Sequence, residues 1–239
     1  MKVMYKDIFE AAQKGSVDDI RFFVEQGVDV NAKNAYDWAP LQGAARYNPD
    51  VEVLKYLIEH GADVYAKSEH IAMPIQLATH RNLEALKYLL SQGIDVKDDY
   101  GWTLLHFAAE CHSNIEVVKY LVESGENVNA KSIYGWTPLH CCVKGYTLDP
   151  GVLKYLIEQG ADVNAKSNNS MTPLHCLLLN LYKDSVDDFD SAIDMLKHLI
   201  EQGADVNACI TPLDLAAASE EIKSIFHAAG GKTGDELSP

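Results

Sequence analysis

TPLHCCVKGYTLDPGVLKYLIEQGADVNAK, residues 137–166, contains two strings that both recur along the chain. The Thr-Pro-Leu-His type string begins at positions 39, 73, 103, 137, 172 and 211. The Gly-x-Asp-Val type string begins at glycines 27, 61, 93, 125, 160 and 203, at steps of 34, 32, 32, 35 and 43 residues. Two strings in phase over six cycles predict a repeat protein, because a period of about 20 to 50 residues is typical of stacked supersecondary units.

Each repeat predicts two short helices. Pro138 fits a first helical turn, where its missing N–H would have no intrahelical partner, and Thr137 can cap that helix. The run 115–122 places its apolar residues on one helical face, and Gly125 can adopt the left-handed conformation that ends a helix. Helices of about ten residues are too short to be stable alone, since isolated helices need ~12 to 15 residues, so we expect packing between repeats to stabilise them.

The second helices share a Tyr-Leu pair that predicts apolar rows running between repeats. The pairs are Tyr56-Leu57, Tyr88-Leu89, Tyr120-Leu121 and Tyr155-Leu156. We expect these residues to supply much of the core that no single repeat can form by itself.

Both strings resemble the signature of the ankyrin-repeat family, Thr-Pro-Leu-His-x-Ala-Ala followed by a turn, a second helix and Gly-Ala-Asp-Val-Asn-Ala. The resemblance covers residues 8–229 and implies an all-α ankyrin-repeat solenoid, in which helix-turn-helix units stack and hairpin-like loops project as fingers. The implied single domain spans residues 1–230, with an atypical first repeat at 8–37, five complete repeats at 38–210, a truncated last repeat at 211–229 and a polar tail at 231–239.

The composition excludes several function classes. Twenty Lys and Arg against 35 Asp and Glu give a net charge of −15, which opposes binding to nucleic acid or anionic lipid because both need clustered positive charge. No stretch approaches the ~20 apolar residues of a membrane span, and the first residues lack the apolar core of a secretory signal. Five scattered cysteines fit reduced thiols. We expect a monomer in the cytoplasm, or in a host cell if the source is an intracellular bacterium.

The sequence does not support a catalytic site or a metal-binding site. The adjacent His and Cys residues are Cys111, His112, His140, Cys141, Cys142, His175 and Cys176. The cysteines after the signature His replace small core residues, where a free Cys behaves as a small hydrophobe rather than as a zinc ligand. The Asp-rich insertion at 182–190 is interpreted as an exposed loop rather than a calcium site. We predict no enzyme activity, no cofactor and no metal.

Departures from the signature affect the fingers. Leu104 replaces the proline, and Gln42, Gln76 and Asp214 replace the histidine. In ankyrin repeats this histidine ties helix to finger, so the resemblance implies less firmly held fingers in the second, third and last repeats. The finger asparagines are Asn31, Asn129, Asn164 and Asn207. They match a position that an animal asparaginyl hydroxylase can modify in such repeats, although Asn is also the commonest residue there.

In this family, partners usually bind the finger tips and the concave face formed by the first helices. All three tryptophans fall in the fingers, and Trp and Tyr are enriched at binding hot spots. One lysine per finger adds positive charge that favours acidic groups on a partner. The fingers without Tyr or Trp carry His70, Ala72, Asn169 and Met171, and we expect the first-helix residues Arg46, Tyr47, His80, Arg81 and Glu110 to extend the surface inward. The predicted binding residues are Lys33, Tyr36, Trp38, Arg46, Tyr47, His80, Arg81, Lys97, Tyr100, Trp102, Lys131, Tyr134 and Trp136.

The predicted function is a non-catalytic protein-protein interaction module that binds an unidentified partner with acidic and apolar groups. Alternatives are an enzyme inhibitor, a host-directed bacterial effector scaffold or an enzyme accessory domain. A structural alternative also stands for the aromatic fingers, whose rings can stack on one another to stiffen the array without binding a partner.

Overall fold

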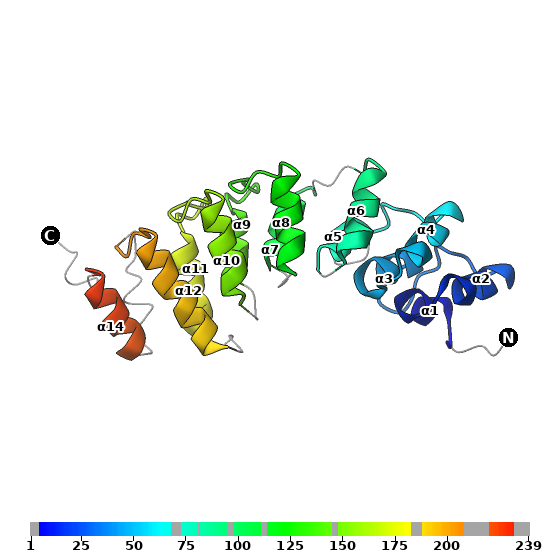
Figure 1. Cartoon of the computed structure of the whole chain (residues 1–239), viewed down its shortest axis with the longest axis horizontal. Helices are drawn as coiled ribbons and strands as arrows, with labels where there is room; N and C mark the ends of the chain where they lie inside the picture. The colour runs from blue at the N-terminus through cyan, green and yellow to red at the C-terminus, as the bar shows by residue number, and fades with distance from the viewer. Residues whose placement is uncertain are drawn as a thin grey trace. The chain divides into compact units, whose positions relative to one another are not determined.

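The computed structural model describes residues 5–67, 73–80, 82–94, 98–110, 114–144, 148–182, 188–207 and 220–231. Within these ranges every regular element is a helix and no β-strand occurs, which confirms the predicted all-α repeat architecture (Figure 1). The chain divides into two compact units, Met1–Val96 and Lys97–Pro239, and each is described by itself. None of the described helices is long and apolar enough to cross a lipid bilayer.

The first unit contains three helix pairs. Its helices are α1 (Ile8–Lys14), α2 (Val17–Glu25), α3 (Pro40–Tyr47), α4 (Val51–Glu59), α5 (Pro74–Ala78) and α6 (Leu83–Ser91). The first helix of each pair packs on the next first helix, so that α3 contacts both α1 and α5. In the same way, α4 contacts α2 and α6. Each pair is therefore one repeat, and first and second helices form separate layers.

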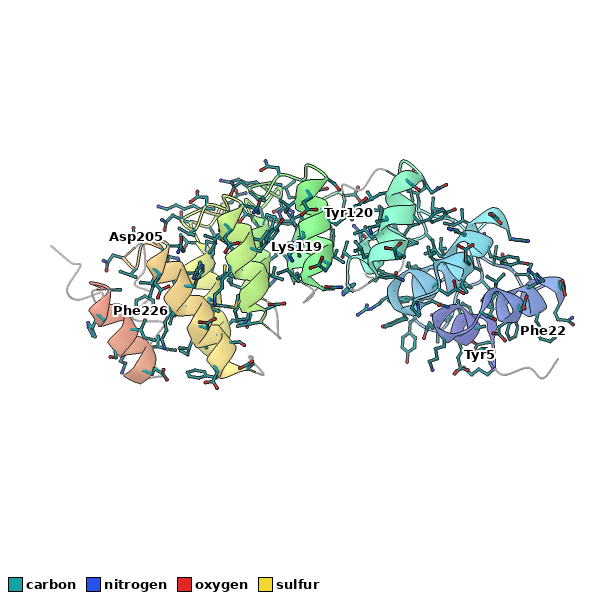
Figure 2. All side chains as sticks on the ribbon, in the orientation of Figure 1. Tyr5, Phe22, Lys119, Tyr120, Asp205 and Phe226 are labelled. Atoms are coloured by element: carbon teal, nitrogen blue, oxygen red, sulfur yellow. The ribbon has the colours of Figure 1, made fainter. Side chains whose placement is uncertain are left out.

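The second unit continues the same pattern. Its described helices are α7 (Leu104–Glu110), α8 (Ile115–Glu123), α9 (Pro138–Cys142), α10 (Pro150–Glu158), α11 (Pro173–Tyr182), α12 (Phe189–Glu201) and α14 (Glu220–Ala228). Helix α9 packs between α7 and α11, while α10 packs between α8 and α12, and these second helices lie side by side in Figure 1. On α14, Phe226 is fully buried and anchors the last described helix (Figure 2).

Proline begins the first helices α3, α5, α9 and α11, and the cap of α9 has a second member besides the predicted Thr137. Pro40, Pro74 and Pro138 lie in the first turns of α3, α5 and α9. Nδ1 of His140 accepts the Thr137 backbone N–H at 3.2 Å and lies 2.8 Å from the Thr137 hydroxyl. The side chain three residues into the helix therefore takes part in the cap together with Thr137.

The second helices are close to the expected length, whereas two first helices are shorter. Helices α4, α6, α8 and α10 have nine residues each, but α5 and α9 have five. The glycines after the second helices adopt the predicted left-handed conformation, as in Gly61 with φ +90° and Gly125 with φ +98°. Glycine is favoured there because a Cβ would strain this backbone conformation.

The core of both units contains the predicted leucine rows. Leu57, Leu89, Leu121 and Leu156 are all buried, with at most 1% of their surface exposed. Their tyrosine neighbours are half-buried, and cations cover two of the rings. The Tyr120 side chain lies on α8 in Figure 2. The rows therefore consist of buried leucines, with the tyrosines at their solvent edge.

Asparagine side chains join the loops that follow the second helices. Asn129 Nδ2 donates to the Gly160 carbonyl at 2.8 Å, and Asn129 Oδ1 accepts from the Asp162 N–H at 2.8 Å. Asn31 and Asn164 make the same two bonds to the loops that follow them. These amides bridge adjacent repeats, which gives the asparagines a structural role.

The insertion in the sixth helix pair is shorter than expected. Helix α11 extends to Tyr182 and α12 begins at Phe189, so both ends of the predicted 182–190 loop are helical. Asp188 caps α12, because its carboxylate accepts from the Ser191 N–H at 3.0 Å. Residues 183–187 lie outside the described residues.

Candidate partner-binding surface

The fingers of the second unit carry stacked tyrosines. The rings of Tyr100 and Tyr134 have centroids 6.2 Å apart and planes inclined by 23°. The Ile133 N–H donates to the Tyr100 carbonyl at 2.9 Å, and the Asn168 N–H donates to the Tyr134 carbonyl at 2.9 Å. At the tips, Ile133 is 56% exposed and Tyr134 is 52% exposed. Backbone bonds between fingers therefore hold apolar groups in contact with solvent.

The finger at residues 132–136 is a tight turn closed by its own backbone. The Ser132 N–H donates to the Trp136 carbonyl and the Gly135 N–H donates to the Ser132 carbonyl, both at 2.9 Å. Gly135 has φ +73°, and a Cβ at this position would lie 2.8 Å from the Asn168 nitrogen. Glycine is required here on both grounds. Asp37 takes the corresponding left-handed position in the first unit, with φ +60°.

The tryptophans lie at the bases of the fingers. Trp102 packs against His106 and Phe107, with ring centroids 5.5 and 5.6 Å apart. Trp136 packs against His140 at 5.6 Å, and both indoles are half-buried. All three tryptophans lie in the fingers as predicted, but Trp102 and Trp136 are less exposed than the tyrosines, because their rings fold back onto the first turns of α7 and α9.

Two buried histidines connect a first helix to the following finger. His106 Nδ1 accepts the Thr103 N–H at 3.1 Å, and its Nε2 donates to the Trp136 carbonyl at 3.0 Å. His140 makes the corresponding bond to the Met171 carbonyl at 3.0 Å. Burial lowers the pKa of both imidazoles, partly offset by these backbone bonds. A neutral imidazole has one nitrogen that donates and one that accepts, as these bonds require. The expected histidine contact between helix and finger therefore exists, and the finger belongs to the next repeat.

The first unit gathers four predicted residues around one finger. The Trp38 and Tyr47 rings stack with centroids 6.4 Å apart. The guanidinium carbon of Arg46 lies 5.7 Å from the Trp38 centroid and 5.2 Å from the Tyr47 centroid. At the finger tip, Tyr36 is 80% exposed. These side chains form an aromatic and cationic corner that a partner can reach.

The predicted lysine column is partly occupied by contacts within the protein. The Lys33 ammonium pairs with Asp37 at 2.8 Å and lies 3.4 Å from the Lys67 carbonyl. The Lys131 ammonium lies 3.5 Å from the Lys166 carbonyl. Both lysines thus contact the following finger. Asp37 already pairs with Lys33 inside the protein, and the role of Lys33 in binding an acidic partner stays a prediction.

Several predicted residues cannot be placed on this surface. Arg81 and Lys97 lie outside the described residues, as do His70 and Ala72 of the second finger. His80 follows α5 and is half-buried.

The structure adds Lys144, which the sequence analysis missed. Its ammonium lies 4.9 Å from the centroid of the Trp136 ring. Lys144 follows Trp136 by eight residues, as Arg46 follows Trp38, so the repeat register alone could have identified it. Glu110, which was expected on this surface, ends α7 and is half-buried. Burial raises the pKa of its carboxyl, and the charge of Lys144 partly offsets that effect.

The described cysteines have the properties of core residues. Cys141, Cys142 and Cys176 are buried free thiols. Burial raises the pKa of all three, that of Cys176 to about 12, so the nucleophilic thiolate is disfavoured. Cys111 and His112 lie outside the described residues. In the described part of the chain, no group of three or more His, Cys, Asp or Glu residues could hold a metal ion.

Comparison with known proteins identifies the family. A family model for ankyrin repeats in three copies matches residues 8–68, 70–132 and 114–208. The solved ankyrin repeat domain of human ASB11 is similar, with a TM-score of 0.74, 22% identity, and coverage of 96% of this chain and 100% of that chain. That likeness shows the fold alone, and a search of curated proteins gave no match. Because the family model matches well over half of its residues, the chain belongs to the ankyrin-repeat family.

Proposed function

We propose that the chain is a non-catalytic binding module whose fingers and first helices hold a segment of a partner protein. Ankyrin repeats are generally protein-protein interaction modules. The observation that carries the proposal is the stacked pair of solvent-facing rings on two consecutive fingers of the second unit, Tyr100 and Tyr134. Rings on fingers that backbone hydrogen bonds hold in place offer apolar area at a low entropic cost.

The bases of the fingers extend this surface toward the first helices. Trp102 and Trp136 are half-buried, so their remaining surface is both accessible and fixed in orientation. Hot spots favour such rings, because a partner can exclude water from them without ordering a flexible side chain. The buried thiols favour a binding role over thiol-based catalysis, and they suit a reducing compartment such as the cytoplasm.

Partner capture by the double variant Trp102→Ala/Trp136→Ala tests the proposal. Each indole is an expected hot spot, so the double variant should no longer capture the protein that the unaltered chain retains from its own cell. A hot spot contributes about 2 kcal/mol, so the affinity should fall by about 30-fold or more. Tyr155→Ala is the matched control, since it removes a half-buried ring from a second helix. Circular dichroism should show unchanged helical content. Undiminished capture by the folded double variant would defeat the proposal.

A further inference from the structure

A small cavity lies between two repeats of the second unit, beside the proposed binding surface. Its volume is about 190 Å³. The lining residues come from two finger bases and from the ends of two first helices: Trp136, Lys144, Met171, Cys176, Leu179 and Asn180. The cavity therefore opens where a segment lying across the fingers would pass.

The walls of this cavity are mainly apolar. Trp136, Met171 and Leu179 contribute a ring, a thioether and an isobutyl group. The Cys176 thiol is buried, and its pKa is raised to about 12, so it stays uncharged. The amide of Asn180 already donates to the Val143 carbonyl at 3.3 Å. The lining thus favours an apolar occupant.

The size indicates one side chain rather than a free small molecule. Pockets for small ligands and cofactors usually measure about 300 to 1,000 Å³. An apolar cavity of about 150 Å³ holds a benzene-sized group. At about 190 Å³, this cavity suits a single large apolar side chain such as Leu, Met or Phe.

Lys144 places a positive charge at the cavity. Its ammonium is stacked 4.9 Å from the Trp136 ring centroid, and the side chain is exposed. Among the described residues no carboxylate forms an ion pair with Lys144, and Glu110 interacts with it only at longer range. Lysines of the second helices differ: Lys119 pairs with Glu116 at 2.9 Å. An unpaired ammonium on an acidic chain suits a carboxylate supplied by a partner.

We infer that the cavity receives a large apolar side chain of a partner protein, and that an Asp or Glu within two residues of it pairs with Lys144. The inference rests on the proposed function, and it specifies the chemistry of the bound segment. The cavity supplies the anchor site, and the ammonium fixes the direction of the segment by attracting its carboxylate. A flexible lysine held against an indole is already partly ordered, which reduces the entropy lost on pairing.

Selection from a phage-displayed library of random 12-residue peptides on the full chain tests the inference. Enriched peptides should combine Leu, Ile, Met or Phe with Asp or Glu no more than two residues away. A synthetic peptide of that pattern should bind in a fluorescence-anisotropy titration, and its affinity should fall as salt is raised. Enrichment of peptides without the acidic residue, or no enrichment at all, would overturn the inference.

Variants of the cavity give the second readout. Leu179→Trp fills the cavity and should weaken the selected peptide by at least 30-fold. Lys144 is exposed, so Lys144→Glu should leave the fold intact and weaken peptide binding by at least tenfold. Lys144→Arg keeps the positive charge and should bind the peptide as the unaltered chain does. Lys119→Glu is the matched control, because it makes the same charge change on α8, on the second-helix side (Figure 2). The inference would be refuted if Leu179→Trp and Lys144→Glu both bound the peptide as tightly as the unaltered chain does.

Two further outcomes separate the inference from the proposed function. Trp102 does not line the cavity. If Trp102→Ala loses the peptide while Leu179→Trp and Lys144→Glu bind it normally, the proposed binding surface stands and the proposed role of the cavity is rejected. Normal binding in all three variants would reject both. Concentration-dependent dimerisation that Leu179→Trp abolishes would assign the cavity to a second copy of this chain and would also overturn the inference.

Discussion

The two units fill one position of the repeat with different side chains. In the second unit, His106 and His140 accept a hydrogen bond at the start of their own helix and donate another to the following finger. In the first unit, Gln42 and Gln76 accept the equivalent bond at 2.8 Å. The Nε2 of buried Gln76 has no hydrogen-bond partner within the described residues.

The difference shows how one side chain can serve two repeats. An imidazole carries its nitrogens on separate edges of a rigid ring, so one nitrogen caps a helix while the other reaches the next finger. Glutamine keeps the capping bond, which explains why helices α3 and α5 still begin at the expected proline. At Gln76 capping and finger attachment are separable, because its side chain caps α5 while its Nε2 has no hydrogen-bond partner within the described residues.

The largest effect should come from the core, which the two units share. Leu57→Ala in the first unit and Leu156→Ala in the second should each lower the free energy of unfolding by about 2 to 5 kcal/mol, since both side chains are buried. Urea unfolding followed by circular dichroism measures the loss. A negligible loss in one unit would break the comparison, because the packing would then differ as well as the finger attachment.

Removing the bond from a histidine to the next finger should have a smaller effect than removing a core leucine. His140→Gln keeps an acceptor for the Thr137 N–H, as Gln76 does for the Met73 N–H, and gives up the bond from the ring to Met171. The free energy of unfolding should fall by about 1 kcal/mol, the usual net value of one hydrogen bond. Peptide-resolved hydrogen exchange should show faster exchange in the finger at 167–172. Unchanged exchange there would mean that the imidazole does not hold the finger.

The same histidines should make stability depend on pH. Burial lowers the pKa of His106 and His140 below the usual 6.5, so in the window beneath that value the unfolded chain binds more protons than the folded one. Their contribution to stability is present above about pH 6.5 and is lost as the pH falls toward the folded pKa. Urea midpoints at about pH 7.5 and about pH 5.5 should differ less in His106→Gln/His140→Gln than in the unaltered chain. An equal difference would assign the acid sensitivity to other groups.

The smallest effect should come from adding a missing bridge to the first unit. Tyr65 occupies the slot in which Asn31 donates to the Gly61 carbonyl at 2.8 Å. Tyr65→Asn should reach the Gly93 carbonyl in the same way and raise the free energy of unfolding by about 0.5 to 1 kcal/mol. Thermal unfolding should show a higher midpoint. A lower midpoint would show that the exposed tyrosine contributes more than the bridge.

The sequence predicted the repeat fold well because its signals are local. A glycine that ends a helix or a proline that begins one acts through its own backbone, and both recur at a fixed period. The buried leucines follow from the same period, since one helical face must meet the next repeat. Capping was predicted only in part, because His140 adds an acceptor for the Thr137 backbone N–H that the Thr signal alone does not reveal.

The sequence predicted which residues form the candidate site but not how deeply each of them is buried. Sequence position identifies Trp102 and Trp136 as finger residues, yet their half-burial depends on the ring folding back onto its own helix. Lys33 could not be known to be paired, because its partner Asp37 is selected by the shape of the turn. Lys144 was detectable by comparison with Arg46, since both follow a finger tryptophan at the same spacing.

Hydrogen exchange with and without a bound peptide tests most directly which surface binds. The probe is the acidic and apolar peptide selected on the full chain, at a concentration well above its Kd. The account predicts slower exchange at residues 98–110, 132–144 and 167–182, which form the fingers and first helices of the second unit. Slower exchange confined to the second helices α8, α10 and α12 would contradict it.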